Sequence, residues 1–273
     1  MPRTLLSLLL VLGAVSLASC GKGGGTTVTI SSPGARTGGS GEAGGSKGNR
    51  STPPGGGNSP SRERALAFAR AVNLTADDVP GFTASAKHSS SSAREKRLER
   101  EMVRCAGTAG LGTAEARAAG GHKALADQDS KEFELKHGII DFSVSSQVSV
   151  QASAAEARKG LTAIRSAHVR NCFSRYLQLI FEGQRVKGAK TGPVSIQAGI
   201  PPAPGTSGGF GWRITASFIV RGIKVPIYLD FLGFVKGPAE VTLLSSGLIR
   251  PFPAEVQQHL FALLLARARE HAL

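Results

Sequence analysis

The sequence of 273 residues is poor in aromatic side chains, acidic side chains and cysteine. Aromatic residues make up 5% of it, with a single Trp, and 19 Asp and Glu stand against 33 Lys and Arg. Hydrophobic residues still amount to 41%, so part of the chain can bury a core, which excludes a fully disordered or collagen-like protein. No apolar run reaches the roughly 20 residues that a spanning helix needs, which excludes a polytopic membrane protein.

The N-terminus has the pattern of a secretory signal. Arg3 precedes an apolar run over residues 5–17, and Leu-Ala-Ser-Cys at 17–20 ends it. These four residues resemble the lipobox of bacterial lipoproteins, in which a diacylglycerol thioether forms on the cysteine. The resemblance implies a signal peptide over residues 1–19 and a lipid anchor on Cys20, which would hold the chain on the extracytoplasmic face of the cell membrane. A non-lipidated secreted protein and an uncleaved short anchor are the alternatives.

Residues 20–61 have the composition of a flexible tether. Positions 21–60 contain 14 of the 35 glycines, together with Ser, Thr, Pro and scattered basic residues. Such a segment cannot bury enough apolar surface to offset the entropy of ordering it. A Gly/Ser-rich coil of this length has a root-mean-square span on the order of 35 Å. The segment serves either as a spacer from the membrane or as a low-complexity leader without a spacing role.

The formal net charge of +14 lies mostly within residues 62–273. A basic protein often binds nucleic acid, but the signal sequence argues against that partner, and no nucleic-acid motif is present. An extracytoplasmic basic surface suits anionic lipid headgroups or anionic envelope polymers. We therefore predict such a polymer or lipid as a partner. The alternative is that the charge only keeps the protein soluble.

Two cysteines remain after Cys20, in a compartment where disulfides persist. Cys105 shares one helical face with Leu98 and Met102, and Cys172 lies on the apolar face of a second helical segment. We predict a disulfide between Cys105 and Cys172. The alternative is a reactive or metal-binding pair, although neither cysteine belongs to a C-x-x-C motif or a Cys/His cluster in the sequence.

The residues after 61 combine helical and strand patterns. Helices are predicted over residues 62–73, from a capping box at 92–95 through Cys105, from a capping box at 153–156 to Gly183, and from Pro253 onward. Alternating apolar residues predict strands over residues 82–88, 131–140, 141–151, 194–198, 212–220, 225–231 and 241–243. A tight hairpin is expected at Arg221-Gly222-Ile223. This order favours one α+β domain over residues 62–273, with an antiparallel sheet packed against helices.

Two segments carry a family resemblance: NLTADDVPGF at 73–82 and HVRNCFSRYL at 168–177. With the lipobox and tether, they resemble actinobacterial lipoproteins of the LpqN type and the extracytoplasmic sensor domain of PknH-type receptor kinases. The resemblance implies a Mog1/PsbP-like sandwich acting as a binding, sensor or accessory module without catalytic residues. The PknH-type sensor has two disulfides lining a cleft, whereas this chain has cysteines for only one.

Catalytic motifs are missing from the sequence. The six histidines are scattered without H-E-x-x-H spacing, and no G-x-S-x-G or S-x-x-K motif marks a serine nucleophile. Asp141 and Glu156 could form a pair of catalytic carboxylates, but Glu156 belongs to a capping box and Asp141 begins a strand. The glycines at 205–211 are expected in a loop without a following helix, which disfavours a phosphate site. We predict no enzyme, no metal site and no cofactor.

Four residues form the candidate binding site. Trp212 follows the glycine-rich stretch, Arg213 and Arg221 flank one predicted strand, and Lys224 begins the next. Strand alternation would place the three cations on one solvent-facing patch for an anionic ligand. The alternative is that Trp212 belongs to the core and the cations are the solvated side of a sheet.

A second function class is a carrier of a lipid or small hydrophobic ligand. It would need an apolar cleft between sheet and helices, lined by residues such as Phe218, Leu229 and Leu264.

Overall fold

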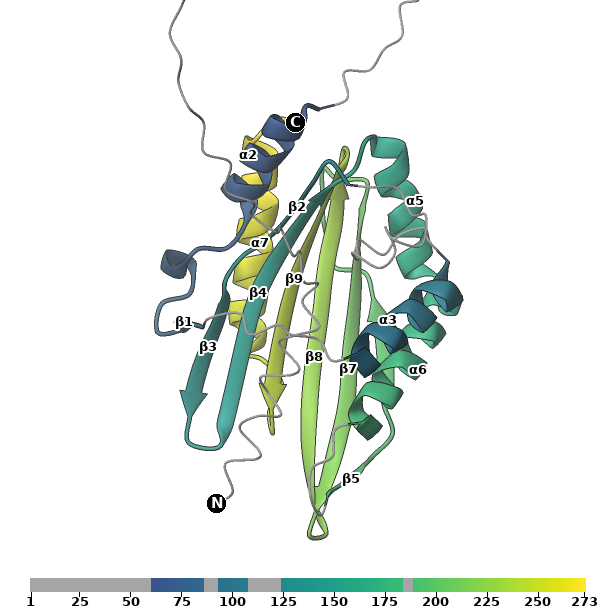
Figure 1. The fold of residues 1–273 in the computed structure, drawn as a ribbon. Helices are drawn as coiled ribbons and strands as arrows, with labels where there is room; N and C mark the ends of the chain where they lie inside the picture. Colours follow the sequence, from purple (N-terminus) through teal and green to yellow (C-terminus); the bar gives the residue numbers. More distant parts are fainter. Residues whose placement is uncertain (1–59, 86–92, 108–123, 184–188) are drawn as a thin grey trace, which may run out of the picture. The chain divides into compact units, whose positions relative to one another are not determined.

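The structure, a computed structural model, describes residues 60–85, 93–107, 124–183 and 189–273 (Figure 1). The signal peptide and most of the tether predicted above lie outside the described residues. The elements are α2 (Arg62–Val72), the short 3-10 helix η2 (Ala76–Asp78), β1 (Thr83–Ser85), α3 (Ala93–Ala106), β2 (Ala126–Asp129), β3 (Glu132–His137), β4 (Ile140–Val150), α5 (Ala154–Arg165), α6 (Ala167–Gly183), β5 (Ala189–Thr191), β6 (Ser195–Gly199), β7 (Gly208–Val220), β8 (Ile223–Lys236), β9 (Ala239–Leu248) and α7 (Ala254–Glu270).

One antiparallel sheet organises these elements. Its strand order is β1-β3-β4-β9-β8-β7-β5, with β2 also paired to β4 and β6 also paired to β7. The long strands β7, β8 and β9 follow one another through hairpins, and β4 pairs with β9. The α+β class with an antiparallel sheet and packed helices is therefore confirmed.

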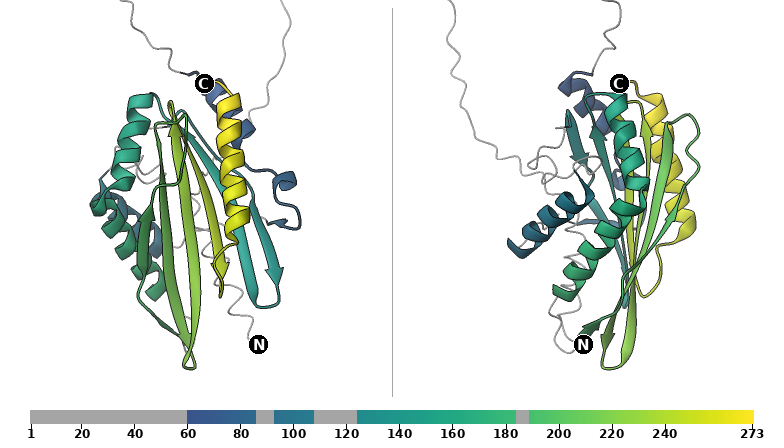
Figure 2. Two further views of the ribbon diagram at one scale, coloured as in Figure 1. Left: turned by 180° about the vertical axis from the view of Figure 1, so that it is seen from behind. Right: turned by 90° about the vertical axis from the view of Figure 1, so that its right-hand side faces the viewer.

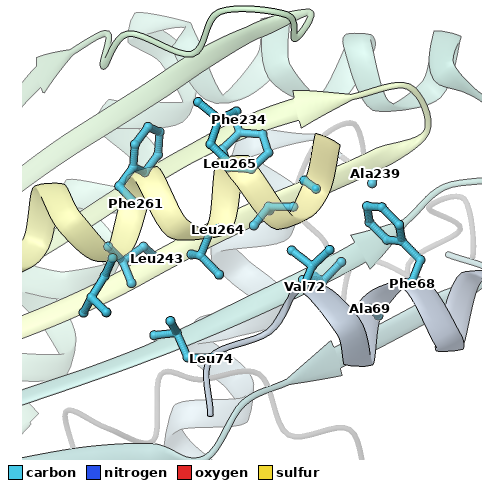
Figure 3. Packing of buried hydrophobic residues seen from close by; sticks show 14 of the residues in the cluster. Phe68, Ala69, Val72, Leu74, Phe234, Ala239, Leu243, Phe261, Leu264 and Leu265 are labelled. Carbon is cyan, nitrogen blue, oxygen red and sulfur yellow. The ribbon is translucent and has the colours of Figure 1, made fainter. Parts of the chain in front are cut away.

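Strand alternation gives the sheet two faces, each covered by different helices (Figures 1 and 2). On the face that we call the α7 face, α2 and α7 pack against β4, β8 and β9. Figure 3 shows this cluster, in which Leu264 and Phe261 of α7 meet Phe234 and Leu243 of the sheet. Phe234 of β8 and Leu243 of β9 share this face because side chains two positions apart along a strand point to the same side of the sheet.

On the opposite face, which we call the α6 face, a second cluster joins α3 and α6 to β7 and β8. Met102 of α3 and Leu177 of α6 belong to it, together with Ile214 and Ile227 of the sheet. Next to it, α5 covers Phe210 and Val235 through Ala157 and Leu161. Buried apolar area is the main favourable term in folding, so both faces contribute to stability.

The structure corrects two expectations and adds two strands. The long helix predicted to end near Gly183 is divided at Ser166, whose hydroxyl accepts a hydrogen bond from Val169 N and so starts α6 as a separate helix. The stretch at 205–211, expected to be a loop, joins the sheet from Gly208 onward. Short strands β2 and β5 were not predicted, because four and three residues are too few to show a period.

Candidate functional site

The four predicted binding residues occupy three different environments. Trp212 is 5% exposed and packs against Phe173 of α6 with ring centroids 5.3 Å apart. Phe231 of β8, which pairs with Trp212 of β7, also contacts Phe173. The indole is therefore part of the α6-face core. Its placement agrees with the core alternative rather than with a solvent-facing site.

Arg213 is an ion-pair residue on the α7 face. Its Nε and Nη2 atoms donate to the two carboxylate oxygens of Asp230 at 2.7 and 2.9 Å. Asp230 is 3% exposed and also accepts from Gln257 of α7, which in turn donates to Ser245. Hydrogen bonds from Arg213 to Asp230 hold the pKa of Arg213 above its usual value. The guanidinium thus compensates a buried carboxylate and stands in a structural network.

Arg221 and Lys224 lie at the tip of the β7–β8 hairpin, away from Arg213. Arg221 and Gly222 form the two-residue turn with φ values of 52° and 81°, the left-handed combination that tight hairpins favour. Lys224 pairs with Ile219, which is six residues from Arg213, or about 20 Å along the strand. The structure therefore keeps Arg221 and Lys224 together and separates them from Arg213.

Two hairpin turns lie at the same end of the sheet. Asp141 of β4, Leu248 of β9 and Ile227 of β8 form one cross-strand row. The β3–β4 turn and the β7–β8 turn both extend beyond this row, and the β7–β8 turn projects further, as Figure 1 shows. Ile139 in the first turn is 64% exposed and Ile223 in the second is 68% exposed.

The described strand and turn residues beyond this row carry charge of one sign. These residues are 137–140, 189–191, 217–226 and 249–251, and none of them is acidic. Four cationic side chains belong to exposed residues within them: Lys190, Arg221, Lys224 and Arg250. Lys190 and Lys224 flank the 38%-exposed Ile219 in one cross-strand row. We call residues 137–140 and 219–225, with Lys190 and Arg250, the basic hairpin end.

Acidic residues gather elsewhere, on the α6 face of β2, β4 and β9. Asp127 and Glu240 both pair with Ser149 and so lie on either side of it on one face. Burial raises the pKa of Glu240 to about 7, and repulsion from Asp127 adds to the effect. Gln147 donates to Asp127 at 3.3 Å. This region is polar because Ser145, Gln147 and Ser149 of β4 share this face, where both serines are buried.

Asp141 is the second perturbed carboxyl of this face. Burial raises its pKa to about 6, while attraction to Lys136 opposes the shift and repulsion from Glu134 and Glu132 adds to it. Glu156, considered above as its catalytic partner, lies in the first turn of α5, and its backbone N–H donates to the hydroxyl of Ser153. Asp141 lies at the other end of β4 from Val150, which precedes the α5 cap Ser153 by three residues. The fold therefore does not support pairing these two carboxylates.

Cys105 and Cys172 form a disulfide that joins α3 to α6, with Cα atoms 5.8 Å apart. His168, one turn before Cys172 on α6, donates from Nε2 to the carbonyl oxygen of Cys105 at 2.7 Å. The two sulfurs and a ring nitrogen of this histidine lie within 4.8 Å of one another. No sequence motif indicates this grouping, because Cys105 is 63 residues from the histidine. Bonded to each other, the sulfurs are not thiolate metal ligands in this state.

The residues proposed to line an apolar cleft do not face a common space. Phe218 and Leu229 belong to the α6-face core, whereas Leu264 belongs to the α7-face core across the sheet. All three are buried in packed clusters. A shallow depression of about 460 Å³ runs along α5, where Arg158, Lys159 and Thr162 line it. Its lining in the described residues is open and partly basic, unlike the enclosed apolar cleft that a lipid carrier would need.

Sequence reasoning missed Asp230, Gln257 and the exposed isoleucines. The sequence did contain the information for Asp230. If residues 221 and 222 form a two-residue turn, the register of the hairpin places Asp230 opposite Arg213. Ile139 follows Gly138, whose φ of 65° belongs to the β3–β4 turn. The strands were predicted to meet at residues 140 and 141, so this turn and its exposed residue were not recognised.

Comparisons with known proteins add little to this description. No protein-family model matches the sequence, and no curated protein matches it significantly. The extracellular domain of PknH from Mycobacterium tuberculosis is similar in structure, with 12% identity and a TM-score of 0.38, covering 79% of this chain and 100% of that one. A protein of unknown function from Pseudomonas aeruginosa gives 15% identity and a TM-score of 0.20, covering 54% and 83%. Likenesses of this size carry no argument about function.

Within the described residues, no helix combines the length and apolar character required to cross a bilayer.

Proposed function

We propose that the mature chain is a non-catalytic binding module, tethered by lipid on Cys20 to the extracytoplasmic face of the membrane. Through the basic hairpin end it contacts an anionic component of the cell envelope. The observation that carries this proposal is the set of four cations, with no acidic residue, on the described strands and turns beyond the Asp141 row. The bound component is a lipid headgroup or an envelope polymer.

Two features support an extracytoplasmic location. The sequence at 17–20 resembles a lipobox, and Cys20 is the residue that would carry the lipid. The Cys105–Cys172 bond is of a kind that persists in oxidising extracytoplasmic compartments and is rare in the cytosol. Both features favour a position of the folded residues outside the cytoplasmic membrane.

Electrostatics favour the hairpin end as the contact surface. Lys190, Arg221, Lys224 and Arg250 are exposed on neighbouring strands and turns. Each Lys or Arg near an anionic surface contributes about 1 kcal/mol, and the attraction falls off within a Debye length of about 8 Å at physiological salt. The nearby Lys136 forms an ion pair with Glu134, so it adds less to the attraction for an anionic surface.

The experiment compares charge reversal at two exposed sites. Arg221→Glu with Lys224→Glu changes the hairpin end, and Arg158→Glu with Lys159→Glu makes the same change in net charge on α5. Binding of the mature protein to isolated envelope from a bacterium of related type is measured at low and high salt. We expect the hairpin variant to lose at least about tenfold in affinity, as roughly 1 kcal/mol per cation implies, and the α5 variant to keep most of it. Equal losses in both variants would show that net charge alone governs binding and would refute the assigned surface.

The tether is tested separately in cells. Cys20→Ser should move the protein from the membrane fraction to the soluble extracytoplasmic fraction or leave it as an uncleaved precursor. Retention of processed Cys20→Ser protein in the membrane after a high-salt wash would contradict the lipid anchor.

A further inference from the structure

We propose that the basic hairpin end docks on an anionic lipid bilayer, with Ile223 and Ile139 entering the interface between headgroups and acyl chains. This inference rests on the proposed function and names its partner. Single exposed apolar residues are ordinary on protein surfaces. Here, however, three of the four large hydrophobic residues that are exposed in the described part of the chain lie at one end of the sheet: Ile139, Ile219 and Ile223.

The isoleucines and the cations alternate in a way that suits a membrane interface. Ile223 lies between Arg221 and Lys224 near the tip of the β7–β8 hairpin, and Ile219 lies between Lys190 and Lys224 across the strands. Interfacial segments bury apolar side chains about 5–10 Å below the headgroups while basic side chains remain at headgroup level. A soluble anionic polymer offers charge but no apolar phase, so it leaves the exposed isoleucines unexplained.

The two turns can reach one flat surface together. Counting from the Asp141 row, Ile223 lies about two residues further out than Ile139, or roughly 7 Å. The turns are separated laterally by about three strand spacings, or roughly 14 Å. A tilt of the sheet by roughly 25° therefore brings both isoleucines to the same plane.

The backbone of the hairpin tip is paired between the two strands of the hairpin itself. The β7–β8 ladder continues to Val220 and Ile223, directly beside the two-residue turn. An unpaired backbone group costs several kcal/mol in hydrocarbon, so this pairing lowers the cost of entering the interface. The β8–β9 ladder begins at Ile227, so residues 223–225 of β8 are paired on the β7 side alone.

The lipid anchor does not prevent this orientation. The described residues begin at 60, immediately before α2. This helix packs near Val150 and Ala239, at the end of the sheet opposite the hairpin tips. About 40 residues separate Cys20 from that point, and a chain of this length can extend to roughly 130 Å. The strand β8 spans only about 46 Å. Anchor and hairpin end can therefore contact the same membrane.

The test uses the mature protein, residues 20–273, with Cys20→Ser so that no lipid is attached. Binding is measured by co-sedimentation with phosphatidylcholine vesicles, with and without about one third phosphatidylglycerol. Ile223→Ser with Ile139→Ser is compared with Ile200→Ser. Ile200 is a matched control because it is 68% exposed, as Ile223 is, but follows β6 near the other end of the sheet. Circular dichroism and thiol counting verify that every variant is folded with its disulfide intact.

A second readout reports the depth of the tip directly. An environment-sensitive fluorophore is attached to Ile223→Cys and, in a separate protein, to Ile200→Cys. We expect binding only to the anionic vesicles, at least about a tenfold loss for the double isoleucine variant and no more than about a twofold change for Ile200→Ser. The label at position 223 should shift to the blue and be quenched by lipid-borne quenchers, and the label at 200 should not.

The outcomes separate this inference from the proposed function. If the isoleucine variant binds anionic vesicles as the parent protein does while Arg221→Glu with Lys224→Glu does not bind, docking is purely electrostatic and insertion is refuted. If the parent protein binds purified teichoic-type polymer but not anionic vesicles, the bilayer is the wrong partner and the proposed function stands. If it binds neither vesicles, polymer nor isolated envelope, both proposals fail.

Discussion

Glu240 offers a quantitative test of the polar region on the α6 face. Its carboxyl is desolvated on β9, and Asp127 lies on the other side of Ser149 on the same face. Together they raise the pKa of Glu240 from 4.5 to about 7. Glu240 therefore binds its proton more tightly in the folded protein than in the unfolded chain. The associated stability is fully present below about pH 4.5 and is lost as the pH rises through 7.

The magnitude follows from the size of this shift. One pKa unit corresponds to about 1.36 kcal/mol, so complete ionisation of Glu240 costs the fold at most about 3 kcal/mol. Since the residue is only partly shielded from solvent, about 2 kcal/mol is a fair expectation. Glu240→Gln keeps the shape of the side chain but cannot ionise. We expect it to be within about 1 kcal/mol of the parent protein near pH 5 and to be more stable by about 2 kcal/mol at pH 8.

Urea denaturation followed by circular dichroism at several pH values between about 5 and 8.5 measures the difference. The difference in unfolding free energy between the two proteins at each pH excludes the contribution of Asp141, because Asp141 titrates in both. Glu270→Gln, at the exposed end of α7, serves as the control for the chemical change from Glu to Gln. A Glu240→Gln effect that is the same at pH 5 and pH 8, or a loss of stability at pH 8, would refute the reasoning.

Three further predictions concern the fold. Cys172→Ser, which removes the bond to Cys105 across 67 positions, should lower the free energy of unfolding by about 2–4 kcal/mol, and a reductant should then no longer affect the thermal midpoint. Arg213→Ala should cost about 3 kcal/mol because it leaves the Asp230 carboxylate buried without its cation, and Asp230→Asn in that background should recover part of the loss in urea denaturation. Gly233→Ala should cost about 1–3 kcal/mol by calorimetry, since a methyl group there would clash with the buried ring of Phe210.

Local patterns in the sequence were sufficient for most of the sheet. The strand over β4 and the turn at 221–222 were confirmed, because side-chain period and left-handed turn residues are properties of short segments. The break at Ser166 was not predicted. Apolar residues continue at helical spacing through it, yet Leu161 packs with Phe210 while Leu177 packs in the α6-face core.

The candidate site depended on information that no single segment contains. Arg213, Arg221 and Lys224 are close in sequence, but an extended strand carries Arg213 far from the other two. Conversely, Lys190 and Ile139 belong to the hairpin end only because β5 and β3 join the sheet where they do. The exposure of an isoleucine also depends on what packs over it, which composition does not reveal. The lipid anchor, tether and binding role remain predictions.

The Cys105–Cys172 bond makes the chain between these residues a closed covalent ring, within which β2, β3, β4 and α5 all lie. The strand β4 is thus inside the ring, while its partner β9 is outside it. A single cut by a protease anywhere between residues 105 and 172 would open the ring without dividing the protein into two molecules. After one such cut within the ring, the two parts of the sheet would therefore stay covalently joined until a reductant breaks the disulfide.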